Sequence, residues 1–113
     1  MRAVSRDELD AWVDLLRRGD DGAAFLRIMR GFESTPAKRA LYVSAVHDVP
    51  YPVQIVWGER DPALKIGVHG EQARRAAGLT TIHRVPAKHF LQEDQPAAVA
   101  GHVAALAATS PGR

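Results

Sequence analysis

The chain contains no cysteine, and aromatic residues make up only 6% of it. Without cysteine, disulfide bonds and cysteine-ligated metal sites are excluded, and the composition agrees with a reducing compartment. No stretch approaches the run of about 18 apolar residues that a membrane-spanning helix needs. The polar first segment, residues 1–9, lacks the apolar core of a signal peptide. We therefore expect a cytoplasmic protein without a membrane partner.

An excess of charge of one sign is also lacking, because 15 lysines and arginines are nearly balanced by 13 acidic residues. Nucleic-acid-binding proteins usually concentrate their basic residues in a stripe or patch. Here the nearest features are three separate pairs, Arg17-Arg18, Lys38-Arg39 and Arg74-Arg75. No nucleic-acid partner is expected, and 46% hydrophobic with 25% charged residues is typical of a globular chain of one domain.

The first half of the sequence predicts only helices. Ser5 and Glu8 have the spacing of a capping box, which begins a helix over residues 5–18 with apolar residues on one face. A second helix is expected between the Asp20-Asp21 pair and Gly31. Thr35 followed by Pro36 predicts a third helix that runs to about Val46.

The second half changes to an alternation of strands and helices. Residues 53–57 (VQIVW) and 80–85 (TTIHRV) are short and rich in β-branched residues, as buried parallel strands are. Helices are expected over residues 70–77, where Gly78 would be the C-cap, and over 95–108, with a loop at 86–94. This order predicts an α/β class with a right-handed crossover between two parallel strands.

Two side chains capable of joint chemistry follow the two predicted strands. Asp61 comes shortly after the first strand and His89 shortly after the second. Because the carboxyl ends of parallel strands meet at one edge of a sheet, the two side chains can come together there. A carboxylate bonded to imidazole Nδ1–H orients a catalytic histidine. Each residue alone also has an ordinary interpretation, Asp61 as a turn residue before proline and His89 as a packed or solvated side chain.

The flanks of both residues resemble the α/β-hydrolase superfamily. Residues 57–62 (WGERDP) resemble the turn that carries the catalytic acid, in the form found in the haloalkane dehalogenase and epoxide hydrolase branch. Residues 88–96 (KHFLQEDQP) resemble the histidine loop that enters the last helix, although Lys88 replaces the usual glycine. The resemblance implies that residues 49–113 are the C-terminal part of an α/β-hydrolase core, with two parallel strands and flanking helices. It also implies that residues 1–48 are a helical cap-like segment.

The resemblance further implies a cofactor-free hydrolase that acts on a small haloalkane, epoxide or ester. Asp61 and His89 would be the catalytic acid and histidine, and Trp12, Phe25 and Phe32 would line the substrate cavity, as cap aromatics do. At helical spacing these aromatic residues are more often plain core. No metal site is expected, because the other histidines have no metal-ligand spacing.

Two features of the family are missing. The sequence contains neither a G-x-S-x-G or G-x-D-x-G nucleophile elbow nor the turn that forms the oxyanion hole. We therefore expect a C-terminal fragment, inactive alone, whose small-molecule substrate would be bound by a full-length parent. Such a fragment would self-associate or pair with the missing N-terminal half. The alternative is a non-catalytic protein of the same fold, either a relic or a partner-binding module.

Overall fold

The computed structural model describes residues 3–109, which form two compact units. The first unit extends to Lys38 and the second begins at Arg39, so the boundary lies within a helix. This division follows spatial contacts, whereas the predicted division after residue 48 follows the change from helical to alternating sequence. Each unit is described by itself below.

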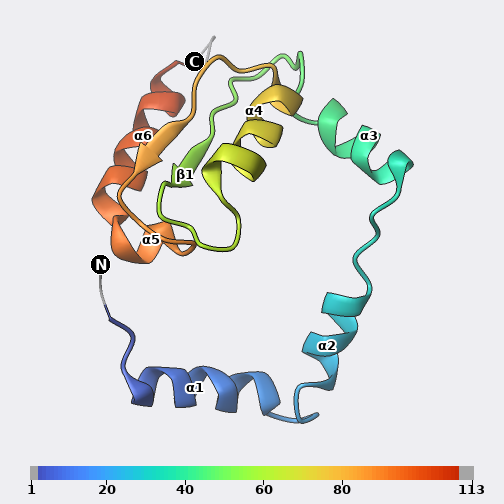
Figure 1. The fold of residues 1–113 in the computed structure, drawn as a ribbon, viewed down its shortest axis with the longest axis vertical. Helices are drawn as coiled ribbons and strands as arrows, with labels where there is room; N and C mark the ends of the chain where they lie inside the picture. Colours follow the sequence, from blue (N-terminus) through green and yellow to red (C-terminus); the bar gives the residue numbers. More distant parts are fainter. Residues whose placement is uncertain (1–2, 110–113) are drawn as a thin grey trace. The chain divides into compact units, whose positions relative to one another are not determined.

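The first unit consists of helices, as predicted. It contains α1 (Arg6–Arg17), α2 (Ala23–Arg30) and the first turn of α3 (Pro36–Ser44) (Figure 1). The predicted capping box is confirmed at the start of α1: Ser5 Oγ accepts from the Glu8 amide at 3.2 Å, and Glu8 Oε2 accepts from the Ser5 amide at 3.0 Å.

The starts of the two following helices also use the predicted side chains, although the N-cap residue of α2 is Gly22 and Asp20 acts from two residues before it. The Ala24 amide donates to Asp20 Oδ2 at 2.8 Å, and the Lys38 amide donates to Thr35 Oγ1 at 3.2 Å. These helices nevertheless have no buried residue. The apolar faces that the sequence predicts on α1 and α2 are therefore exposed within their own unit.

The second unit is a mixed α/β structure around two short parallel strands, β1 (Val56–Gly58) and β2 (His83–Val85). Val56 pairs with His83 and Gly58 with Val85. Helices lie on either side of the strand pair, α4 on one side and α6 on the other (Figure 1). The strands are connected by η1 (Ile66–Gly70), a single π-helical turn, and α4 (Glu71–Ala77), and β2 is followed by α5 (Leu91–Asp94) and α6 (Pro96–Ala108).

Both strands are shorter than predicted, and β1 is half-buried rather than buried. Residues 53–55 contribute one further backbone bond, in which Ile55 O accepts from the His83 amide at 2.9 Å. The physical reason is that β1 has a neighbouring strand on one edge only, within the described part of the chain. The predicted loop over residues 86–94 also contains the short helix α5.

The core of the second unit sits where β2 ends. Val85 and Ala87, at 2% and 0% exposure, are the two buried hydrophobic residues among those the structure describes. Asp61 lies with them as the buried charged residue. No helix within residues 3–109 is both long enough and apolar enough to cross a membrane.

Candidate active site

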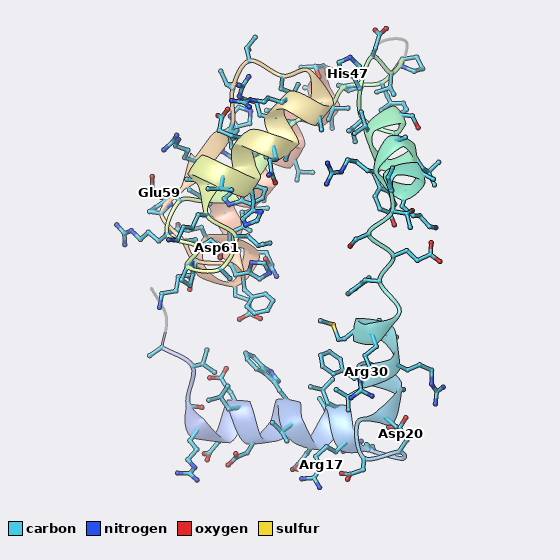
Figure 2. The ribbon with its side chains drawn as sticks, turned by 45° about the vertical axis from the view of Figure 1, so that its right-hand side comes forward. Arg17, Asp20, Arg30, His47, Glu59 and Asp61 are labelled. Carbon is cyan, nitrogen blue, oxygen red and sulfur yellow. The ribbon has the colours of Figure 1, made fainter. Side chains whose placement is uncertain are left out.

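Backbone hydrogen bonds hold the turn after β1 against the loop after β2. The Glu59 amide donates to Val85 O and the Arg60 amide to Ala87 O, each at 3.0 Å. The turn closes when the Asp61 amide donates to the carbonyl of Gly58 at 3.1 Å. Figure 2 shows Glu59 and Asp61 on this turn. Two segments that are far apart in sequence are thereby fixed at one edge of the sheet.

Glycine is required at position 58 because the second loop passes directly over it. A Cβ placed on Gly58 would stand 2.7 Å from the Ala87 carbonyl oxygen and closer still to that of Lys88. Both neighbours are backbone atoms of a loop that is itself hydrogen-bonded to the turn, so they cannot swing aside. The missing side chain of Gly58 therefore sets how closely the two loops approach.

This approach brings Asp61 and His89 into contact, and the predicted geometry is confirmed. His89 Nδ1 lies 2.7 Å from Asp61 Oδ2. The other carboxylate oxygen, Oδ1, accepts from the amides of Ala63 and Leu64, each at 2.9 Å. The Asp61 side chain is only 5% exposed, and each of its two carboxylate oxygens has at least one hydrogen-bond partner. The pocket that holds this carboxylate is thus complete.

The balance of these interactions favours the ionised carboxylate. Burial by itself raises the pKa of Asp61, but the hydrogen bonds from His89, Leu64 and Ala63 outweigh it, and the net pKa is lowered from 3.8. An ionised carboxylate can only accept, so His89 Nδ1 carries the hydrogen. In the neutral imidazole the lone pair is then on Nε2, the nitrogen that can act as a base.

The outer side of His89 is open. Its side chain is 49% exposed, and the ring of Phe90 meets it edge-on at a centroid distance of 5.2 Å. No hydroxyl or carboxylate among residues 3–109 forms a hydrogen bond to Nε2. The described residues therefore provide an oriented base without a nucleophile next to it.

A tryptophan anchors the far end of the acid turn, which the sequence did not predict. Trp57 Nε1 donates to Leu64 O at 2.8 Å, and the Leu64 amide in turn donates to Asp61. Trp57 thus braces the loop that holds the carboxylate, whereas the sequence predicted it only as the last residue of a buried strand. The only sequence signal for this role is its position directly before Gly58.

The three aromatic residues proposed for a substrate cavity lie in the first unit. Trp12 is on α1, Phe25 is on α2 and Phe32 lies two residues after the end of α2, with exposures of 37%, 43% and 70%. Phe25 lines a hollow at the junction of α1 and α2, together with Leu16 and Ile28. Their contact with a substrate remains a prediction.

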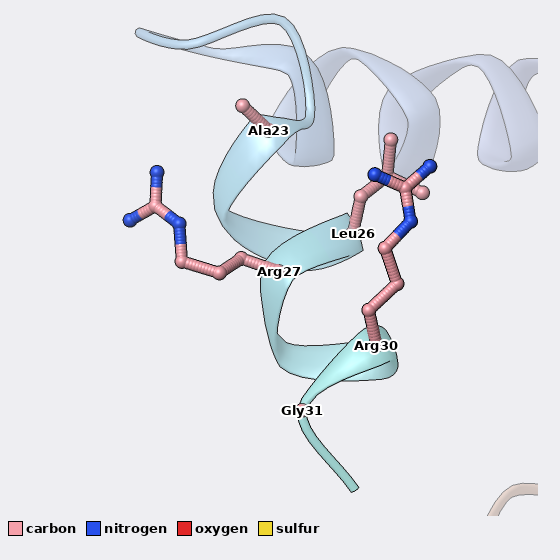
Figure 3. Close-up of a pocket in the computed structure, with 5 residues that line it drawn as sticks. All are labelled: Ala23, Leu26, Arg27, Arg30 and Gly31. Atoms are coloured by element: carbon pink, nitrogen blue, oxygen red, sulfur yellow. The ribbon is translucent and has the colours of Figure 1, made fainter.

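Other hollows and clusters offer less chemistry. A hollow on α2 is lined by two basic side chains that extend away from each other, Arg27 and Arg30, so they do not converge on a ligand (Figure 3). No group of three or more histidine and carboxylate side chains capable of holding a metal ion occurs within the described residues. The pair Asp61–His89 remains the arrangement with the clearest catalytic geometry.

Comparison with protein-family models, with curated proteins and with solved structures finds no match to this chain.

Proposed function

We propose that this chain supplies the acid and histidine of an α/β-hydrolase active site whose nucleophile lies outside these 113 residues. The observation that carries the proposal is the 2.7 Å contact between His89 Nδ1 and Asp61 Oδ2 at the carboxyl ends of two adjacent parallel strands. Further support comes from the WGERDP and KHFLQEDQP segments, which resemble the acid turn and histidine loop of that superfamily.

In this proposal Asp61 holds the imidazole in the Nδ1–H tautomer and stabilises the imidazolium when it forms. His89 Nε2 then takes a proton. Where the nucleophile is an aspartate, the proton comes from the water that hydrolyses the covalent intermediate; where it is a serine, it comes from the attacking hydroxyl. The substrate is a small electrophile of the haloalkane, epoxide or ester class, and no cofactor takes part.

The decisive experiment starts from the coding DNA upstream of the Met1 codon, read in frame for a G-x-S-x-G or G-x-D-x-G elbow. A polypeptide extended to include such an elbow is assayed with an activated ester, an epoxide and a haloalkane. Turnover that is lost in His89→Ala and retained in His47→Ala, an exposed histidine of the same unit, is the expected result. Absence of any elbow, or turnover that survives His89→Ala, would contradict the proposal.

The competing function is a non-catalytic module that binds a partner. The observation in its favour is that His89 Nε2 has no nucleophile next to it in the described residues. This alternative predicts a stable fold and partner binding that His89→Ala leaves unchanged, so the same variant separates the two functions.

A further inference from the structure

A hollow in the second unit, which begins at Arg39, combines basic and apolar side chains. It lies between α3, η1 and α4, with a volume of about 540 Å³, which falls within the range of roughly 300–1,000 Å³ typical of small-molecule sites. Its polar lining consists of Arg39, His69, Gln72 and Arg75, and it has no acidic side chain. We propose that this hollow binds a small anionic molecule that carries a phosphate or carboxylate group.

The two arginines are available to an external anion. Arg39 has no carboxylate partner among the residues that the structure describes. Among the described residues, the carboxylate that lies within 4.0 Å of Arg75 belongs to Glu71, which already accepts from Arg74 Nη2 at 2.8 Å and Nε at 3.0 Å. Glu71 Oε2 lies 4.0 Å from Arg75 Nε, and the Arg75 side chain is 77% exposed. Most of its donors therefore face water.

The neutral lining residues suit the rest of such a ligand. Gln72 offers two amide hydrogens, and the His69 imidazole donates one hydrogen in either tautomer. Leu64, Ala73 and Ala76 provide an apolar surface beside these donors. A ligand with a charged head and a short apolar body matches both parts of the lining better than a bare inorganic ion does.

The hollow also borders the acid turn. Leu64 lines it, and the Leu64 amide is one of the two that bond Asp61 Oδ1. The NMR chemical shift of the Leu64 amide should therefore change when a ligand binds in the hollow. None of the basic residues of the hollow forms a hydrogen bond or ion pair with Asp61 or His89, so ligand binding there does not require the hydrolase function.

The test is a titration of the whole chain with phenyl phosphate, benzoate and inorganic phosphate at constant ionic strength, followed by amide NMR of Leu64, Ala73 and Ala76. We expect saturable shifts with phenyl phosphate or benzoate, and weaker binding of inorganic phosphate. Replacing one charged donor by Arg39→Gln or Arg75→Gln should weaken binding about tenfold, as expected for a lost charge-assisted hydrogen bond.

Arg84→Gln is the matched control, since it removes one positive charge from the same unit outside the hollow. It should leave the affinity unchanged, and an unshifted amide of Arg60, which donates to Ala87 O at 3.0 Å, verifies that each variant is folded. The proposal is overturned if neither organic anion gives saturable shifts. It is equally overturned if Arg84→Gln weakens binding as much as the two lining variants, because binding would then depend on the net charge of the unit and not on the residues that line the hollow.

Discussion

Gly58 and Ala87 approach so closely that a methyl group on Gly58 would stand 2.7 Å from the Ala87 carbonyl oxygen. Ala87 is two residues before His89, and Gly58 is three residues before Asp61. The contact between the acid and the histidine therefore depends on a backbone approach that only glycine permits.

Gly58→Ala should destabilise the second unit by about 1–3 kcal/mol, the usual effect of overpacking a site that cannot relax. Gly101→Ala is the matched control, because its Cβ meets nothing within 4 Å and it lies inside α6. A helical glycine replaced by alanine should raise stability by about 0.5–1 kcal/mol. Denaturant unfolding of both variants and of wild type measures these changes in the free energy of unfolding. Equal stability of Gly58→Ala and wild type would show that the two loops can separate without cost.

The stability of the second unit should fall in acid through Asp61. Its pKa is lowered on folding, so the stabilisation is complete above the unfolded value near 3.8 and is lost as the pH falls through the lower folded value. Glu71 acts in the same direction, because the hydrogen bond from Arg74 lowers its pKa. The free energy of unfolding, measured against pH for wild type and for Asp61→Asn, isolates the contribution of Asp61 to this loss of stability in acid. If both proteins lose stability identically in acid, Asp61 makes no such contribution.

His89 should be in the Nδ1–H tautomer at neutral charge, since Asp61 Oδ2 accepts from Nδ1 at 2.7 Å. Nitrogen-15 NMR of the imidazole measures which nitrogen carries the hydrogen. Asp61→Asn should reduce the preference for this tautomer, because an amide can donate to the ring as well as accept from it. His47, which is exposed, provides an internal reference in the same spectra. A wild-type His89 with its hydrogen on Nε2 would argue against its role as a base.

The 113-residue chain alone should not hydrolyse esters, epoxides or haloalkanes efficiently. An oriented histidine without a nucleophile or an oxyanion hole retains only residual catalysis. Steady-state assays of the purified chain test this. A turnover number near 1 s⁻¹ or above, ordinary for an enzyme, that disappears in His89→Ala would mean that the chain contains its own nucleophile.

The open edge of β1 should promote association. Ile55 O and the Glu59 amide bond β2, so the backbone of Val56 points to the opposite edge, where no strand lies within the described residues. A free edge pairs readily with another chain. Size-exclusion chromatography over a range of concentrations should show self-association. Hydrogen exchange at Val56 should slow as the protein associates. A monomer at every concentration with a strongly protected Val56 amide would contradict this.

Local sequence signals were sufficient for the helix starts and for the class of the second half. The capping box at Ser5 and the glycine after α4, Gly78, act within a few residues, so their effect can be read without the rest of the fold. The pairing of Asp61 with His89 was also predictable, because parallel strands bring their carboxyl ends to one edge. The hydrolase assignment and the role of Trp12, Phe25 and Phe32 stay predictions.

Other features depended on residues distant in sequence and emerged only from the tertiary structure. The length of β1 is set by its one neighbouring strand, which the apolar run at residues 53–57 does not reveal. The bond from Trp57 to Leu64 and the fit of Gly58 under Ala87 arise from packing between loops. Likewise, Arg39 and Arg75 line one hollow although they are 36 positions apart in the sequence. Hydrogen bonds and side-chain packing between such segments have no periodic pattern, so only the folded arrangement discloses them.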